Sequence, residues 1–252
     1  MTRNVIEAVN KAREFFNIKD FPGNFFTLLE QQNYIEKYNL LLFKEDIAKL
    51  SGFIGYGENE LSIICINYKR PIGHQNFTLA HELGHWFLHK GQNISDDDRN
   101  CIYSSDIKEK EANEFAAELL YPESLFVQDY FVAIENGLLQ NDKRKELAIY
   151  IDSLCHRYCL SFDMIFRKVL YKNRQVAQHD KIKKEIEKAL GCKISECFDK
   201  DFYVPNESLS EYQSLKSPYM ELEKRINRLV ELGKIGEATA EAIKYRNGIN
   251  ID

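Results

Sequence analysis

Residues 77–89 read "FTLAHELGHWFLH", and this stretch determines how the rest of the chain is interpreted. It holds His81, Glu82 and His85 in the pattern His-Glu-x-x-His. On a helix turning about 100° per residue, the two histidines lie about 40° apart and one turn along, so both imidazoles can reach one ion. The large apolar residues lie on the other side of the helix: Leu79, Leu83, Trp86 and Phe87. The stretch therefore predicts a helix with a metal-binding face and a packing face.

Short strands are expected before this helix. "LLLF" (40–43) and "ELSIICINYK" (60–69) are typical of strands, and the glycine-rich "SGFIGYG" (51–57) separates them. "RPIGHQN" (70–76) is expected to be a loop, and the motif helix is expected over 76–90. A small sheet should therefore lie beside the motif.

Helical patterns dominate the remaining chain. Apolar spacing predicts helices over 4–19, 25–37, 108–120, 146–158, 161–173 and two within 221–243, with a polar connection over 92–106 and a loop over 199–210. Ser161 is a suitable N-cap for the helix that follows it. The fold class is thus α+β and helix-rich.

Composition and charge narrow the classes of protein. The chain has 252 residues, of which 44% are hydrophobic, so a substantial core is available. Residues 141–190 hold 12 Lys and Arg against 7 Asp and Glu, a charge of +5 that leaves −10 for the rest of the net −5. We interpret the basic stretch as a solvated helical surface, because nucleic-acid binding usually needs more concentrated charge. Direct nucleic-acid binding is therefore not favoured.

The termini and the cysteines indicate a cytoplasmic protein. The N-terminal residues mix charges among apolar positions, unlike a signal peptide, and no apolar run approaches the length of a membrane span. None of the six cysteines forms a Cys-x-x-Cys pair, so no disulfide framework is expected. Cys155 and Cys159 are interpreted as reduced thiols in the core.

A third ligand is expected from the helix "KEKEANEFAAELL" (108–120). Its apolar residues define a buried arc: Ala112, Phe115, Ala116, Leu119 and Leu120. Of its four glutamates only Glu109 falls within this arc, and a buried carboxylate is costly unless it is paired or binds a metal. We therefore predict Glu109 as the third ligand, with His89 as its competitor. Asn113 could accept the spare N–H of a ligating histidine.

The predicted ligand set suggests hydrolysis. Two histidines and a glutamate leave the fourth zinc position open, as in catalytic sites. Glu82 is placed to act as the general base. Tyr121, Tyr103 and His156 are candidate donors to an oxyanion, and the sequence does not distinguish among them. The strand "LSIICIN" (61–67) could offer an edge for an extended polypeptide substrate.

Two motifs together resemble the ImmA/IrrE family of zinc metallopeptidases. "FTLAHELGHWFLH" followed by "EKEANEFAAELLYP" is similar to that family's motif helices, with Tyr121 where the family often has Met. The likeness covers about 25–175 and includes "LSFDMIFRKVL", which is similar to the helix-turn-helix-like end of such proteins.

The resemblance implies a zincin-like core and an endopeptidase that cuts a helix-turn-helix repressor of a mobile element or stress response. Zn²⁺ would be held by His81, His85 and Glu109, with Glu82 as base and Asn113 behind a ligand. We divide the chain into a metallopeptidase domain (1–140), a helix-turn-helix-like segment (141–175) and a helical extension (176–252).

The extension is interpreted as packing rather than as a recruiting or dimerising module, and no oligomeric state is assigned. The alternative function is a zinc-containing protein that contacts a repressor or DNA without cleaving. The intact Glu82 argues against this alternative.

Overall fold

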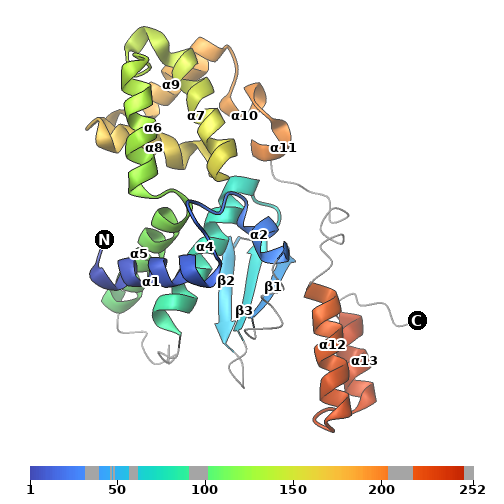
Figure 1. The fold of residues 1–252 in the computed structure, drawn as a ribbon. Helices are drawn as coiled ribbons and strands as arrows, with labels where there is room; N and C mark the ends of the chain where they lie inside the picture. The colour runs from blue at the N-terminus through green and yellow to red at the C-terminus, as the bar shows by residue number, and fades with distance from the viewer. Residues whose placement is uncertain are drawn as a thin grey trace.

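A computed structural model describes residues 1–31, 40–45, 47, 49–56, 62–90, 102–203 and 218–246 (Figure 1). The first part holds α1 (Arg3–Phe15), α2 (Phe25–Gln31), β1 (Leu40–Glu45), β2 (Gly52–Tyr56), β3 (Ser62–Asn67), α4 (Ile72–His89) and α5 (Ile102–Leu120). Helices α6 (Glu123–Glu135), α7 (Arg144–Tyr158), α8 (Phe162–Lys172) and α9 (His179–Leu190) follow. Short α10 (Ile194–Cys197) and α11 (Lys200–Tyr203) precede α12 (Pro218–Glu231) and α13 (Glu237–Arg246). The predicted helix-rich α+β class is confirmed.

The described strands form one sheet in the order β1-β3-β2, beside the motif helix α4 (Figure 1). Strand β3 pairs in parallel with β1 and antiparallel with β2. The expectation that 61–67 offers a free edge is therefore wrong, since β3 has a neighbour on both sides. The segment 51–57, interpreted as a separator, contains β2, whose backbone pairs with β3 from Gly52 opposite Ile66 to Tyr56 opposite Ser62.

Both motif helices begin earlier than the sequence predicts. Helix α4 starts at Ile72, so most of the expected loop 70–76 is helical, with Pro71 as the N-cap residue. Proline fixes φ near −65° and its missing N–H costs nothing ahead of a first turn, which explains this start. Helix α5 starts at Ile102, inside the expected connection 92–106. Residues 91–101 and 32–39, including the end of the expected helix 25–37, lie outside the described part.

Asn76 fixes α4 to segments that lie both before and after it in the sequence. Its side chain is fully buried, accepts a hydrogen bond from the backbone N–H of Phe25 at 2.8 Å, and donates to the carbonyls of Gly23 and Cys159 at 2.9 and 3.0 Å. One turn before it, a Cβ on Gly73 would lie 2.5 Å from the backbone of Leu160. The start of α4 thus meets the turn between α7 and α8 backbone to backbone.

The turn between α7 and α8 follows the sequence expectations. Ser161 is the N-cap of α8 and its hydroxyl accepts from the N–H of Met164, as predicted. Cys155 and Cys159 are buried thiols without a disulfide, and burial raises the pKa of each to about 12. They are inert core residues, as the sequence indicated.

The C-terminal extension has two parts. Helices α9 to α11 contribute Ile182, Ile186, Ile194 and Phe202 to the main core, whereas α12 and α13 bury Ile226 and Ala240 in a small cluster of their own. Residues 200–203 are helical, which corrects the start of the loop expected over 199–210, and 204–217 lie outside the described part.

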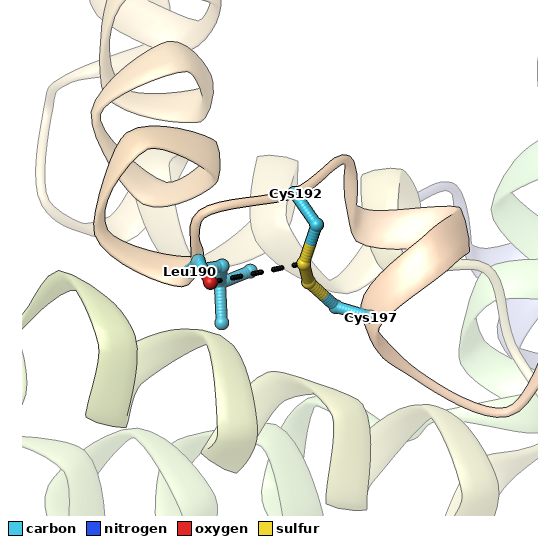
Figure 2. The surroundings of a disulfide bond; sticks show 3 residues. All are labelled: Leu190, Cys192 and Cys197. Carbon is cyan, nitrogen blue, oxygen red and sulfur yellow. Dashed lines mark hydrogen bonds between the residues drawn. A yellow bond between two sulfur atoms is a disulfide. The ribbon is translucent and has the colours of Figure 1, made fainter.

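The structure contains one disulfide that the sequence did not predict. Cys192, after α9, is bonded to Cys197 at the end of α10 (Figure 2). The pair escaped the sequence prediction because its spacing of five is not a Cys-x-x-Cys pattern. Among the described helices, none is both long and apolar enough to cross a membrane.

Candidate metal centre

Three predicted ligands converge at the crossing of α4 and α5. The Nε2 atoms of His81 and His85 lie 3.1 Å apart. Glu109 places one carboxylate oxygen 3.2 Å from Nε2 of His81 and the other 3.3 Å from Nε2 of His85. Within the described part of the chain, this is the one group of His, Cys, Asp and Glu side chains arranged to share an ion.

The spacing and chemistry of these atoms fit zinc. Donor atoms 2.0 to 2.1 Å from a tetrahedral zinc ion lie roughly 3.3 Å from one another, close to the three distances found here. Burial, with His81 close by, lowers the pKa of His85 to about 4, so its imidazole is neutral at pH 7 and keeps a lone pair for a metal. The His₂Glu set is a known catalytic zinc arrangement.

The prediction that the carboxylate of Glu109 is buried is wrong. Its side chain is 57% exposed, although the apolar arc next to it is buried as predicted. What brings Glu109 to the histidines is a close helix crossing, because a Cβ on Gly84 would lie only 3.1 Å from the Cα of Ala112. The third donor therefore depends on interhelical distance rather than on burial.

Glu82 lines the same cleft as His81, His85 and Glu109 but is not one of the three converging residues. Its side chain is buried, with 7% exposure, and the backbone N–H of Ile54 on β2 donates to it. Burial and the nearby charge of Glu109 raise the pKa of Glu82 to about 7. A carboxylate with a pKa near neutrality is suited to exchange protons at physiological pH.

Each histidine has a hydrogen-bonding partner behind it. Nδ1 of His81 lies 3.1 Å from Oδ1 of Asn113, the contact that the sequence predicted. Nδ1 of His85 lies 3.0 Å from Nδ1 of His89. His89, the predicted competitor of Glu109, is thus held behind a ligand and does not join the converging donors.

Two of the three predicted candidates for the oxyanion donor, Tyr121 and His156, are not at the site. Tyr121 is buried and its hydroxyl donates to Asp129 at 3.0 Å, beside the stacked ring of Tyr158. His156 pairs with Asp152 at 3.5 Å and packs on Phe202. Both serve the helical part of the fold, and the side chain of Tyr103 lies outside the described part.

The sequence analysis missed Tyr56 on β2. Its ring lines the same cleft of about 520 Å³ as His81, Glu82, His85 and Glu109. The hydroxyl donates to the backbone carbonyl of His85 at 3.4 Å, and burial, with the charge of Glu82, raises the pKa of Tyr56 to about 12. It is therefore protonated and able to donate. A strand pattern at 52–56 would have been the signal to find it.

A small sheet beside a His-Glu-x-x-His helix, with a glutamate from the next helix, defines the zincin-like class of metallopeptidase domains. The model of the IrrE N-terminal-like domain, peptidase family M78, matches residues 35–150. Residues 35–150 of the chain are therefore similar to the ImmA/IrrE family of metallopeptidases. Metallopeptidase ImmA of Bacillus subtilis (strain 168) is 29% identical over 86 residues, which cover 34% of this chain. The match spans 50% of that relative's length.

Proposed function

We propose that this protein is a zinc-dependent endopeptidase. The observation that supports this proposal best is the convergence of His81, His85 and Glu109 at distances that fit zinc, with the buried carboxylate of Glu82 on the same cleft. A structural zinc site would need a fourth protein donor. Among the described residues only three converge. The geometry therefore favours a reactive centre.

The residues divide the work of peptide hydrolysis. Zinc, when bound, would supply Lewis-acid chemistry to the scissile carbonyl and to water. Glu82 takes a proton from the attacking water and passes it to the leaving amine, a role suited to a carboxyl with a pKa of about 7. We propose that Tyr56, whose ring lines the cleft and whose hydroxyl now donates to the carbonyl of His85, donates a hydrogen bond to the developing oxyanion.

Strand β2 supports a polypeptide substrate. Its outer edge has no strand partner within the described part of the sheet, and Gly52, Phe53, Ile54 and Tyr56 from this strand line the cleft. An extended peptide can add to such an edge through backbone hydrogen bonds. We therefore propose that β2, rather than 61–67, provides the edge for an extended substrate. The cleft therefore suits a segment of unfolded or locally opened protein.

The substrate class follows from the family resemblance. We propose a regulatory protein, most simply a helix-turn-helix transcriptional repressor of a mobile element or stress response. What supports this is the match of residues 35–150 to the family model and the likeness of 160–170 to a helix-turn-helix-like end. Direct contact of this chain with DNA is not part of the proposal.

The test compares new protein N-termini in the host cell expressing either the wild type or Glu82→Gln. Mass spectrometry should detect termini that appear only with the wild type and that map to a helix-turn-helix regulator. Glu82→Gln should retain zinc, because its side chain is not one of the three converging donors. The variant is thus a matched control for binding without cleavage.

Two results would contradict the proposal. Identical termini in the two strains, during growth and after DNA damage, would favour the alternative of a zinc-containing binding protein. Cleavage by Glu82→Gln at the rate of the wild type would remove Glu82 as the general base.

A further inference from the structure

His89 lies behind the metal face of α4 with both ring nitrogens engaged. Its side chain is buried, with 4% exposure. Nδ1 lies 3.0 Å from Nδ1 of His85, and Nε2 lies 3.3 Å from Oε2 of Glu111 on α5. The three side chains form a continuous path from a metal-site histidine to a carboxylate on the neighbouring helix.

Only one arrangement of protons satisfies this path when His85 offers Nε2 to a metal. Nε2 of His85 faces His81 and Glu109, so a neutral His85 carries its proton on Nδ1. That N–H donates to Nδ1 of His89, which must then carry its own proton on Nε2. The second N–H donates to Glu111, an acceptor. Every nitrogen has one role, and no two donors face each other.

We propose that His89 and Glu111 are positioning residues that fix the tautomer and ring orientation of His85 for metal binding. This inference rests on the proposed metal centre and extends it by two residues. Partners of this kind are known to change metal affinity by roughly 10- to 100-fold. Asn113 plays the matching part for His81, at 3.1 Å. Helix α5 then supplies one ligand, Glu109, and an acceptor for each histidine path.

The surroundings argue against packing as the sole role of His89. Its half-buried neighbour Glu111 lies on the wall of a second cavity, of about 460 Å³, between α1, α4 and α5. His89 lines both this cavity and the metal cleft, so it separates the two. An apolar side chain would fill the same place more cheaply, since a buried polar group gains only when it is hydrogen-bonded. The presence of a histidine here is explained by the hydrogen bonds of its two ring nitrogens with His85 and Glu111.

The test measures the zinc dissociation constant of the full chain by competition with a chelator. His89→Leu keeps the volume and removes the acceptor for His85, so zinc should bind roughly 10- to 100-fold more weakly. His89→Asn places an amide oxygen near the position of Nδ1 and should recover most of that loss. If His89 served only for packing, His89→Leu should bind zinc at least as tightly as His89→Asn, because leucine suits a buried site better than asparagine.

A nitrogen NMR spectrum of metal-free protein gives a second readout. The share of His85 that is protonated on Nδ1 should be highest in the wild type, similar in His89→Asn and lowest in His89→Leu, because leucine removes the acceptor beside Nδ1 while Glu109 still accepts from Nε2. Glu111→Leu should weaken zinc binding in the same direction as His89→Leu, by a smaller factor because it is one bond further away. Melting temperatures of the metal-free variants identify loss of folding.

Matched controls separate the role of these residues from general damage. Glu114→Gln changes a carboxylate one turn along α5 that faces the N-terminal ammonium at 3.5 Å, and His156→Leu removes a histidine outside the cleft. Both should bind zinc as the wild type does. If His89→Leu bound zinc as tightly as the wild type, or more tightly than His89→Asn, the positioning role of His89 would be refuted while the metal centre itself would stand. A wild type that binds no zinc would refute the metal centre itself.

Discussion

Glu82 is a buried carboxylate whose ionised form is poorly stabilised by the metal-free fold. The backbone N–H of Ile54 partly offsets the effects of burial and of Glu109, yet the pKa of Glu82 still rises to about 7. Below its ordinary pKa, 4.5 here, the group is protonated in both the folded and unfolded chains and has no such cost. Above pH 7 it is ionised in both, and the folded state alone is destabilised. A buried carboxylate with a raised pKa lowers the stability of the fold, so its presence points to a role in the reaction rather than in stability.

Glu82→Gln should therefore stabilise the metal-free protein at pH 8. The shift from 4.5 to about 7 corresponds to a gain on the order of 3 kcal/mol in the free energy of unfolding, which shrinks as pH falls from 7 towards 4.5. Urea unfolding at pH 8 and at pH 4.5 measures both ends of this range. A gain of equal size at the two pH values would contradict the raised pKa.

Glu109→Ala should lose zinc while the fold is retained. The side chain is 57% exposed, so its removal leaves no cavity, yet it provides the only carboxylate among the converging donors. Metal content after gel filtration and the melting temperature without metal test the two statements separately. A variant that keeps one equivalent of zinc would disprove the ligand assignment.

At the level of elements, the crossing of α4 and α5 and the placement of β2 create the site. Gly84 permits the crossing, because a side chain there would meet the backbone of Ala112 at 3.1 Å. Strand β2 brings Tyr56 to the cleft and the N–H of Ile54 to Glu82. Neither contact is local in sequence.

Gly84→Val should weaken zinc binding by at least about tenfold, since it forces α5 away from α4 and moves Glu109 from the histidines. Gly236→Ala is a suitable control, because a Cβ at Gly236 meets nothing within 4 Å. Chelator competition on both variants measures the effect. Unchanged zinc affinity in Gly84→Val would show that the crossing tolerates a side chain.

At the level of the whole molecule, the metallopeptidase part and the helices after it share one core. Helices α6, α7, α8 and α9 contribute to the same buried cluster as α1, α4 and α5. Asp129 on α6 accepts from the hydroxyls of Tyr121 and Tyr158 at 3.0 and 2.6 Å and so links the end of α5 to α7. Helices α12 and α13 have a separate small cluster. The division at 140 and 175 stays a prediction.

Removal of 204–252 should therefore leave the zinc affinity unchanged and lower the melting temperature by no more than a few degrees. Removal of 176–252 should be strongly destabilising, because it also takes Ile182, Ile186 and Phe202 from the main core, each worth about 1.5 to 3 kcal/mol. Thermal unfolding and zinc titration of the two shortened chains make the comparison. Equal stability of both would contradict the role given to α9 to α11.

Local patterns predicted much of this protein from its sequence. The spacing of His81 and His85 sets two donors on one helix face whatever the surroundings, because four residues make about one helical turn. The capping of α8 by Ser161 and the buried arc of α5 depend on neighbours in the chain and were likewise predicted. The sequence did not predict the early starts of α4 and α5, because the first turns of these helices have a weak helical pattern and form through packing against other elements.

The sequence by itself thus determined that His81 and His85 share one face of a helix with Glu82 beside them, and that the fold is of the α+β class. The tertiary structure alone decided that β2 is a strand, that Tyr56 rather than Tyr121 or His156 lies on the cleft, and that His89 stands behind His85. It also showed that the close crossing of α4 and α5, rather than burial of the carboxylate, brings Glu109 to the two histidines. Contacts between elements depend on how closely two backbones approach, and no periodicity within one element encodes that distance.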